Sequence, residues 1–362
     1  MLDSMSERSP ARGSAANVGR RQALVACALF AAITAGLFVL LPEGEMWRAS
    51  EERCFKVVGE MVRSGDWLVP RLDGVLRLQK PPLFYWAGAV SAELTGGPSL
   101  WSLRAVSALC GLALAGLVFA VGRSLGGMRT GLIATAALGA SLLFYDRART
   151  GDAEPLLSLL VFGALVVFER LWRTRDARLL PALAVLVGLG FLTKATAALL
   201  GIFAPILAWL ALHRQLRLAL RPAVLAWGAL AVALGLSWYA LILLYVPGSP
   251  SYFSQVLVSP FGVRVGGDAR HLREIWYYWP RFPLNTAPTG LLFPWLAFEC
   301  WRTRFFRDDP RLSFFAISIG VLLVAWTCVP QKQIHYLLPL VPLQALVAAR
   351  VIERRLDQRA AS

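Results

Sequence analysis

Long apolar runs separated by short charged segments constrain this 362-residue chain more than any other feature. Several runs approach the roughly 17–25 residues that cross a bilayer, and flanking Trp, Tyr and Arg can complete the shorter ones. With 57% hydrophobic and only 16% charged residues, the chain has too little polar surface for a soluble domain. We therefore predict an all-α integral membrane protein with about ten transmembrane helices. The runs are residues 22–41, 103–121, 130–144, 155–168, 181–192, 195–212, 222–246, 286–298, 312–329 and 334–349.

Arginine is concentrated in the short segments between these runs. If these segments and both tails lie in the cytoplasm, that side carries 21 of the 37 Lys and Arg residues but 9 of the 22 acids. This asymmetry follows the positive-inside rule and explains the net charge of +15 without a nucleic-acid partner. It also makes residues 42–100 one large first outer loop. Within that loop, the apolar stretch 81–94 is short for a span and is predicted to be an interfacial helix.

The predicted organisation is one transmembrane domain with two tails. Residues 1–21 are predicted as a disordered cytoplasmic tail, residues 22–351 as the transmembrane domain and residues 352–362 as a second cytoplasmic tail. The five cysteines have no metal-binding spacing and imply no disulfide framework. The first apolar run is too long for a signal peptide, so we interpret it as a retained anchor.

The lysines are distributed unevenly. The chain has 33 arginines but only four lysines, and all four fall on the predicted outer side: Lys56, Lys80, Lys194 and Lys332. A compact ammonium group differs chemically from a guanidinium fork. We therefore expect some of these lysines to bind phosphate or carboxylate groups; the alternative is chance in an arginine-rich sequence.

Two outer carboxylates lie close to the membrane, where acidic residues are costly and tend to mark function. Glu51 follows the first apolar run, and Asp152 lies in a short loop between two runs. If they meet in one cavity, one of them can accept a proton from an attacking hydroxyl group. The alternative is that both only cap helices or solvate loops.

Histidine and aromatic residues also occur on the outer side. His271 and His335 are the only outer histidines, and each is consistent with either a structural role or a place in the cavity. The aromatic run 276–279, which includes Tyr278, forms an interfacial belt or lines a pocket for a sugar or a lipid tail. Tyr336 follows His335 in the last outer turn.

Several ordered motifs lie in the outer segments. They are Glu51-x-Arg53, SGDWLVP at 64–70, Lys80-Pro81-Pro82, a second-loop segment containing Asp152, GLGFLTK ending at Lys194, RHLREIWYY from Arg270 and KQIHYLLP from Lys332. Together they closely resemble the bacterial membrane glycosyltransferases of the GT-C fold. These include the protein mannosyltransferases and, closest in pattern, the aminoarabinose transferases that modify lipid A. The resemblance extends from about residue 45 to residue 345.

The resemblance implies a polyprenyl phosphate donor, namely undecaprenyl phosphate, that carries a hexose or an aminopentose. It implies a lipid A, other envelope-lipid or protein acceptor at the periplasmic face of a bacterial inner membrane. Cations stabilise the charge that grows on the departing phosphate. The implied phosphate-binding residues are Lys80, Arg53, Arg147 and Arg149, with Lys194 and Lys332 as further candidates. The implied cavity residues are His271, Tyr278, His335 and Tyr336.

Two positions depart from the family pattern. Ser50 stands where relatives have an aspartate that is favoured as the base, so the role passes to Glu51 or Asp152 or is absent. Gln79 replaces the acid before Lys-Pro-Pro, which in relatives can hold a divalent metal with the loop histidine. We therefore assign no metal ligand and expect at most weak metal binding. The alternatives are a non-catalytic relative that binds lipid-linked sugar and a flippase or transporter, although no inverted repeat supports the transporter.

Overall fold

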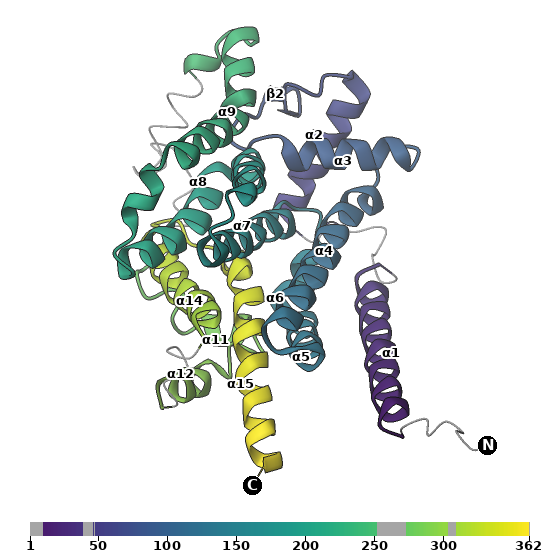
Figure 1. The fold of residues 1–362 in the computed structure, drawn as a ribbon. Helices are drawn as coiled ribbons and strands as arrows, with labels where there is room; N and C mark the ends of the chain where they lie inside the picture. The colour runs from purple at the N-terminus through teal and green to yellow at the C-terminus, as the bar shows by residue number, and fades with distance from the viewer. Residues whose placement is uncertain (1–9, 39–45, 47, 252–272, 303–308, 362) are drawn as a thin grey trace, which may run out of the picture.

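The apolar runs form helices because a backbone inside a bilayer must satisfy its hydrogen bonds internally. The structure is a computed structural model, and it describes residues 10–38, 46, 48–251, 273–302 and 309–361. Figure 1 shows a bundle with α2 and α3 at one end and the end of α15 at the other. The elements, with η marking 3₁₀ helices, are α1 (Pro10–Phe38), α2 (Ala49–Ser64), β1 (Arg71–Leu72), β2 (Val75–Leu76), α3 (Leu83–Leu94), α4 (Leu100–Gly126), α5 (Met128–Gly139), α6 (Leu142–Ala148), α7 (Glu154–Thr174), η1 (Ala177–Leu179), α8 (Leu180–Leu212), η2 (Leu216–Leu220), α9 (Pro222–Tyr245), α11 (Phe282–Asn285), α12 (Phe293–Arg302), α14 (Pro310–Cys328), η4 (Ile334–Leu340) and α15 (Val341–Ala361).

The predicted class, an all-α membrane protein, is confirmed. Among the described residues, seven helices are long and apolar enough to cross a membrane. The pair α5 and α6, bent by 69°, adds an eighth if it forms one span. The predicted number of about ten is higher than this. The difference arises in two regions, the helix α8 and the predicted run 286–298.

The helix α8 combines two predicted runs, but its backbone reverses direction at Lys194, where φ is −160° and ψ is 79°. A Cβ added at Gly190 would lie 3.1 Å from Cβ of Ala198. In a continuous helix these two residues would be about 12 Å apart along the axis. The two limbs of α8 therefore run antiparallel, and the two predicted runs are separate limbs that meet at Lys194.

The predicted run 286–298 does not form a span. Its residues 286–292 form turns that follow the short helix α11, and the rest of the run begins the short helix α12. Pro288, Gly290 and Pro294 fall within this run, and proline and glycine interrupt helices. The stretch 81–94 forms α3, which has 12 residues and is not a candidate span, in agreement with an interfacial helix.

The helix ends differ from the predicted tail boundaries. The helix α1 already begins at Pro10, inside the tail predicted as disordered over residues 1–21, and α15 continues to Ala361 through the predicted tail 352–362. Residues 1–9 and 362 lie outside the described residues. The division into one domain with two tails stays a prediction.

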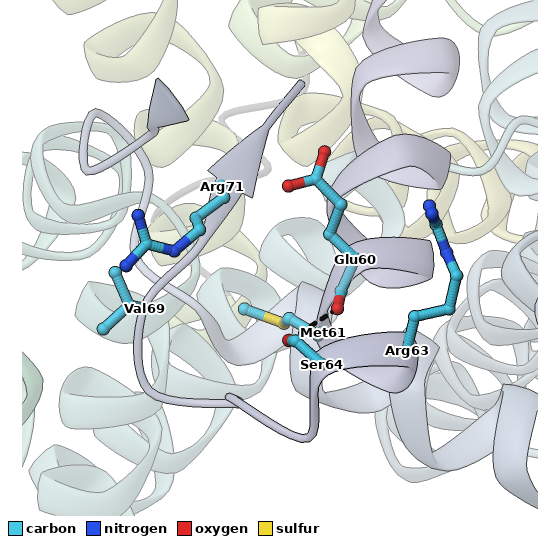
Figure 2. Close-up of a pocket in the computed structure, with 6 residues that line it drawn as sticks. All are labelled: Glu60, Met61, Arg63, Ser64, Val69 and Arg71. Carbon is cyan, nitrogen blue, oxygen red and sulfur yellow. Dashed lines mark hydrogen bonds between the residues drawn. The ribbon is translucent and has the colours of Figure 1, made fainter. Parts of the chain in front are cut away.

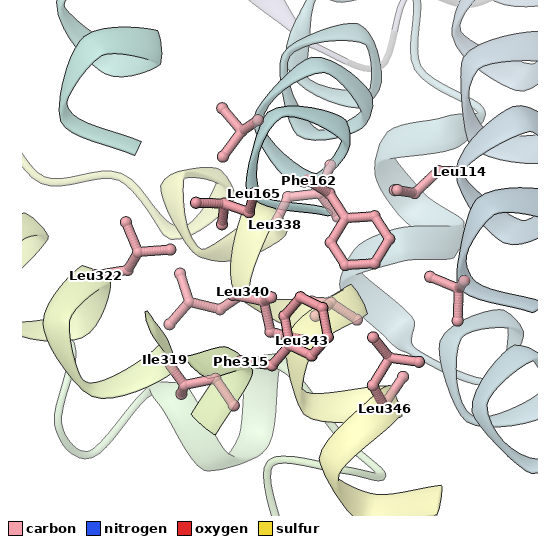
Figure 3. Close-up of a cluster of buried hydrophobic side chains, with 14 of the residues drawn as sticks. Leu114, Phe162, Leu165, Phe315, Ile319, Leu322, Leu338, Leu340, Leu343 and Leu346 are labelled. Atoms are coloured by element: carbon pink, nitrogen blue, oxygen red, sulfur yellow. The ribbon is translucent and has the colours of Figure 1, made fainter. Parts of the chain in front are cut away.

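The core of the bundle surrounds the last span. The span 334–360 has 78% of its window buried, against 6% for the first span, so η4 and α15 are central and α1 is peripheral. Since lipid is as apolar as leucine, close packing rather than the removal of water holds these helices together. Figure 3 shows this core, in which four regions meet: Leu114 of α4, Phe162 and Leu165 of α7, Phe315, Ile319 and Leu322 of α14, and Leu338, Leu340, Leu343 and Leu346 of η4 and α15.

The first predicted outer loop forms a separate layer at one end. Gly65, with φ of 71°, ends α2, and the positive φ of Asp73 and Gly74 allows β1 and β2 to pair as a tight antiparallel hairpin. The buried face of α2 packs on α3 in a second apolar cluster, which includes Cys54, Val57, Met61, Phe84 and Tyr85. This packing holds Glu51 and Lys80 near the bundle.

Candidate active site

Asp152 lies in the loop between α6 and α7 and is 3% exposed. Its Oδ1 accepts a hydrogen bond from the Glu154 backbone N–H at 3.1 Å, and its Oδ2 pairs with Arg147 Nη1 at 3.2 Å. Burial, reinforced by the charge of Glu154 and opposed by that of Arg147, raises the pKa of Asp152 to about 6. At neutral pH such a carboxylate is ionised and can accept a proton, as a general base requires.

Glu51 is fully buried and lies beside the same loop. Arg104 donates to both of its oxygens, from Nε to Oε1 at 2.6 Å and from Nη2 to Oε2 at 2.9 Å. The backbone N–H of Gly151 donates to Oε1 at 2.9 Å. This bidentate pair joins α2 to α4 and to the loop that carries Asp152. The structure brings the two predicted carboxylates together, but it leaves Asp152 the better placed to exchange a proton.

Two residues of this group, Arg104 and Glu154, are not among those predicted from the sequence. Arg104 lies inside a predicted apolar run, and an arginine at such a position needs a partner, which was the available signal. Glu154, in the first turn of α7, pairs through Oε1 with Lys194 Nζ at 2.6 Å and lies 3.4 Å from His335 Nε2. Its Oε2 is buried and has no hydrogen-bond partner among the described residues. For Glu154 the signal was its position two residues after Asp152, directly before a predicted apolar run.

Lys194, which the sequence predicts to bind phosphate, and His335 and Tyr336, which it predicts to line the cavity, gather around Glu154. Lys194 Nζ lies 4.4 Å from the centroid of the Tyr336 ring, a cation–π distance. The His335 and Tyr336 rings meet edge to face, with centroids 4.8 Å apart. Three elements, α7, the reversal of α8 and η4, therefore converge on one carboxylate.

Lys80 is half-buried at the edge of this group. It forms no hydrogen bond or ion pair within the part of the chain that the structure describes. Its charge lowers the pKa of Asp152, and burial lowers its own pKa. Lys80 is therefore a cation beside the buried carboxylates that is available to an anionic ligand.

The other predicted cations have different surroundings. Arg147 holds Asp152 and lies 3.1 Å from Asp146, while Arg53 is exposed. Arg149 Nη1 donates to the Tyr145 hydroxyl at 3.1 Å. None of these contacts by itself identifies a phosphate site.

Lys332 and Tyr278 hold the chain around η4. Lys332 Nζ donates to the Arg273 carbonyl at 3.2 Å, and the Tyr278 hydroxyl donates to the Gln333 carbonyl at 3.1 Å. Tyr278 is fully buried. His271, the other predicted cavity residue, lies outside the described residues.

The described residues do not fit a tightly held divalent metal. Within them, no three His, Cys, Asp or Glu side chains gather as a ligand set. Asp152 and Glu154 are already paired with Arg147 and Lys194, and Gln79 is exposed and carries a neutral amide. Hard divalent cations favour anionic oxygen ligands, so no step of the reaction is assigned to a metal.

A pocket of about 250 Å³ lies at the other end of α2, away from this group. Figure 2 shows its lining residues, Glu60, Met61, Arg63, Ser64, Val69 and Arg71. The Glu60 carboxylate accepts hydrogen bonds from the N–H groups of Asp73 and Gly74 and so holds the hairpin turn. None of the predicted site residues lines this pocket.

The fold is that of the GT-C membrane glycosyltransferases. The chain is similar to the crystal structure of ArnT from Cupriavidus metallidurans bound to undecaprenyl phosphate, with a TM-score of 0.75 and 22% identity over 91% of this chain and 60% of that one. It is also similar to the oligosaccharyltransferase of Archaeoglobus fulgidus in the apo form, with a TM-score of 0.58 and 16% identity over 93% of this chain and 51% of that one.

The sequence comparisons point to particular relatives. Residues 79–240 match the dolichyl-phosphate-mannose-protein mannosyltransferase family. Undecaprenyl phosphate-alpha-4-amino-4-deoxy-L-arabinose arabinosyl transferase 1 of Sodalis glossinidius is 29% identical over 323 residues, 86% of this chain and 56% of the relative. The transferase of that kind from Aeromonas salmonicida is 28% identical over 88% of this chain and 58% of the relative. The chain thus spans a little over half of their length, and its predicted resemblance to the aminoarabinose transferases is confirmed.

The pair of Glu51 and Arg104 makes a prediction about stability. Glu51→Gln should destabilise the protein by about 3–5 kcal/mol, because it removes the buried carboxylate charge that pairs with the buried Arg104 guanidinium. Thermal unfolding of the purified protein in detergent measures the effect. Glu52→Gln is the matched control, since Glu52 pairs with Lys56 at the surface, and it should cost less than about 1 kcal/mol. Equal melting temperatures for both variants would contradict the assignment of Glu51 as a structural ion pair.

Proposed function

We propose that this protein is a membrane glycosyltransferase that transfers a sugar from undecaprenyl phosphate to an acceptor at the periplasmic face of the inner membrane. The observation that carries the proposal is Lys80, an available cation beside the buried carboxylates Asp152 and Glu154. Its support from outside the chain is the likeness to ArnT, whose crystal structure holds undecaprenyl phosphate. The donor sugar is a hexose or an aminopentose, and the acceptor is lipid A, another envelope lipid or a protein.

The proposed reaction is an inverting displacement at the anomeric carbon. An acceptor hydroxyl attacks that carbon and gives its proton to Asp152, whose raised pKa suits a base at neutral pH. The bond from the anomeric carbon to the phosphate oxygen breaks, and its electron pair stays on the departing polyprenyl phosphate. Lys80 stabilises the negative charge that develops there.

Glu51 and Glu154 act in this proposal by positioning other groups. Glu51, held by Arg104, accepts from Gly151 and so fixes the backbone directly before Asp152. Glu154 donates its backbone N–H to Asp152 and neutralises Lys194. We therefore assign the base role to Asp152 and a positioning role to Glu51.

One specific observation favours a second candidate, a relative that binds lipid-linked sugar without transferring it. Ser50 is half-buried at the start of α2, where the family pattern has aspartate. A serine hydroxyl is not a base at neutral pH, so a relative that depended on that aspartate would be inactive with serine.

Two measurements separate the candidates. Mass spectrometry of membrane glycolipids and glycoproteins, with and without the gene, should show a product that disappears on deletion. Purified protein should also transfer sugar from undecaprenyl phosphate to that acceptor. Binding of undecaprenyl phosphate without any transfer would favour the non-catalytic candidate, and neither binding nor transfer would contradict both.

The proposed orientation makes a prediction that cysteine labelling tests. In a cysteine-free background, Gln79→Cys should react with an impermeant maleimide applied to the periplasmic side, while Arg173→Cys should react only after lysis. Both positions are exposed, and they lie at opposite ends of α7 because Lys80 lies near Glu154 and Arg173 is near the end of that helix. The physical basis is the excess of arginine on the predicted cytoplasmic side. The reverse labelling pattern would overturn the orientation.

A further inference from the structure

The segment that leads into α3 carries a second cation besides Lys80. Arg77 is half-buried, and its backbone N–H donates to the Pro70 carbonyl at 2.9 Å, which fixes the path of this segment. The Nε of Arg77 is buried without a hydrogen-bond partner, and the side chain forms no ion pair with any described residue. A guanidinium group that is always charged and partly desolvated is costly unless an anion accompanies it.

Tyr85, in the first turn of α3, adds a third donor without an acceptor. The side chain is 2% exposed, and its hydroxyl donates to no acceptor among the described residues. Burial raises the pKa of Tyr85, whereas the charge of Arg77 and hydrogen bonding by its side chain act in the opposite direction, so the guanidinium lies beside the hydroxyl. A buried donor without an acceptor costs about 1–3 kcal/mol.

The neighbouring Cys54 does not neutralise these cations. It is buried on α2 and lies close enough to Lys80 and Arg77 for both charges to act on it. Burial nevertheless raises the pKa of the Cys54 thiol to about 11, so at neutral pH it carries no charge. The α3 helix begins directly after this segment without a side-chain cap, and a helix N-terminus favours negative charge. Two cations, a hydroxyl and a helix start thus lie in one neighbourhood, and the carboxylates that act on Lys80, Asp152 and Glu154, are already paired with Arg147 and Lys194.

We propose that Arg77 is a second phosphate-binding residue, which acts with Lys80 on the phosphate of the polyprenyl donor. This inference rests on the proposed function. The donor is a phosphodiester with one negative charge, which one cation balances. When the bond from the anomeric carbon to oxygen breaks, the released phosphate monoester carries up to two negative charges, since its second pKa is about 6. Two cations therefore match the departing group better than the bound donor, and such differential binding accelerates the reaction.

The pH dependence of phosphate affinity tests this inference, because the charge of the ligand changes with pH. If Arg77 were only structural, its replacement would not alter that dependence. The purified full-length chain in detergent is titrated with undecaprenyl phosphate at pH 5 and at pH 8, in the Asp152→Asn background. Between these values the phosphate loses its second proton, so binding should tighten about tenfold or more. In Arg77→Gln this tightening should be lost, while the affinity at pH 5 stays within about threefold of that of the Asp152→Asn protein that keeps Arg77. Arg77→Lys should keep most of it, because the charge is retained.

The titratable groups around the phosphate require the Asp152→Asn background. Asp152 titrates near the same pH, and its negative charge at high pH would oppose the phosphate. The charged and titratable groups that face Lys80 and Arg77 are Arg53 and Cys54 of α2, Tyr85 of α3, Asp152 of the loop, Glu154 of α7 and Lys194 of α8. His335 of η4 faces Lys80 across Glu154.

The matched control is Arg71→Gln. Arg71 lies on the same hairpin and lines the pocket at the far end of α2 (Figure 2), so this variant removes one positive charge without touching the proposed site. It should keep the tightening between pH 5 and pH 8. If Arg77→Gln does not fold, Arg77→Leu removes the charge and places an apolar side chain at this position.

The outcomes separate the inference from the proposed function. Loss of the tightening in Arg77→Gln or Arg77→Leu, but not in Arg71→Gln, supports Arg77 as a phosphate ligand. Unchanged tightening in the neutral Arg77 variants, or an equal loss of affinity at both pH values, overturns it while the proposed function stands. If the unsubstituted chain does not bind undecaprenyl phosphate at either pH, both the proposed function and this inference are wrong.

Discussion

Lys80→Ala is expected to abolish sugar transfer, lowering turnover by at least about 10²–10³-fold, the usual cost of removing a group that stabilises developing negative charge. Lys80 forms no ion pair within the described chain, so its loss should leave expression and folding intact. Turnover of undecaprenyl-phosphate sugar by the purified protein, at subsaturating donor, measures the effect. Lys80→Arg should recover only part of the rate, because Pro81 and Pro82 restrict the backbone and a guanidinium is less compact than an ammonium.

The control for this variant is Lys56→Ala. Lys56 lies on the same predicted outer loop and pairs at the surface with Glu52 and Asp73, so its removal should leave transfer near the original rate. Near-normal turnover of Lys80→Ala would show that the donor phosphate is held elsewhere. A loss of folded protein in Lys80→Ala would instead show that Lys80 is structural.

Asp152→Asn is expected to lower turnover by about 10²–10⁴-fold, the usual cost of removing a general base. In the unsubstituted protein, turnover should fall as the pH drops through about 6, because Asp152 becomes protonated and can no longer accept the proton. An aspartate with an ordinary pKa near 4 would stay ionised over this range. The rate of Asp152→Asn should therefore be low and nearly independent of pH between 5 and 7.

Asp66→Asn is the matched control. The Asp66 carboxylate accepts hydrogen bonds from the N–H groups of Leu68 and Val69, and an asparagine side chain keeps an oxygen that can do the same. Its turnover and pH profile should match those of the unsubstituted protein. Full activity of both Asp152→Asn and Glu51→Gln would exclude the carboxylate mechanism and favour the non-catalytic relative.

The membrane class and the main helices could be predicted from the sequence, because hydropathy along a run is a local property. The alternation of arginine-rich segments also predicted that Lys194 and Asp152 share one side of the membrane. The structure brings the two residues to one end, since Lys194 pairs with Glu154, which follows Asp152 by two residues. The motif Lys80-Pro81-Pro82 directed attention to the outer loop because it resembles a family pattern.

The pairing of the charged side chains was decided only by the tertiary structure. Glu51 and Arg104 are 53 positions apart, and Glu154 meets Lys194 across 40 positions, so neither pair leaves a local pattern in the sequence. The roles of Glu51 and Asp152 could not be separated from sequence for this reason, since both are outer acids next to apolar runs. The two roles differ because the packing of α2, α4 and α6 places a different arginine beside each carboxylate. Composition and periodicity determine which segments become helices, whereas the partner of each buried charge depends on how those helices pack against one another.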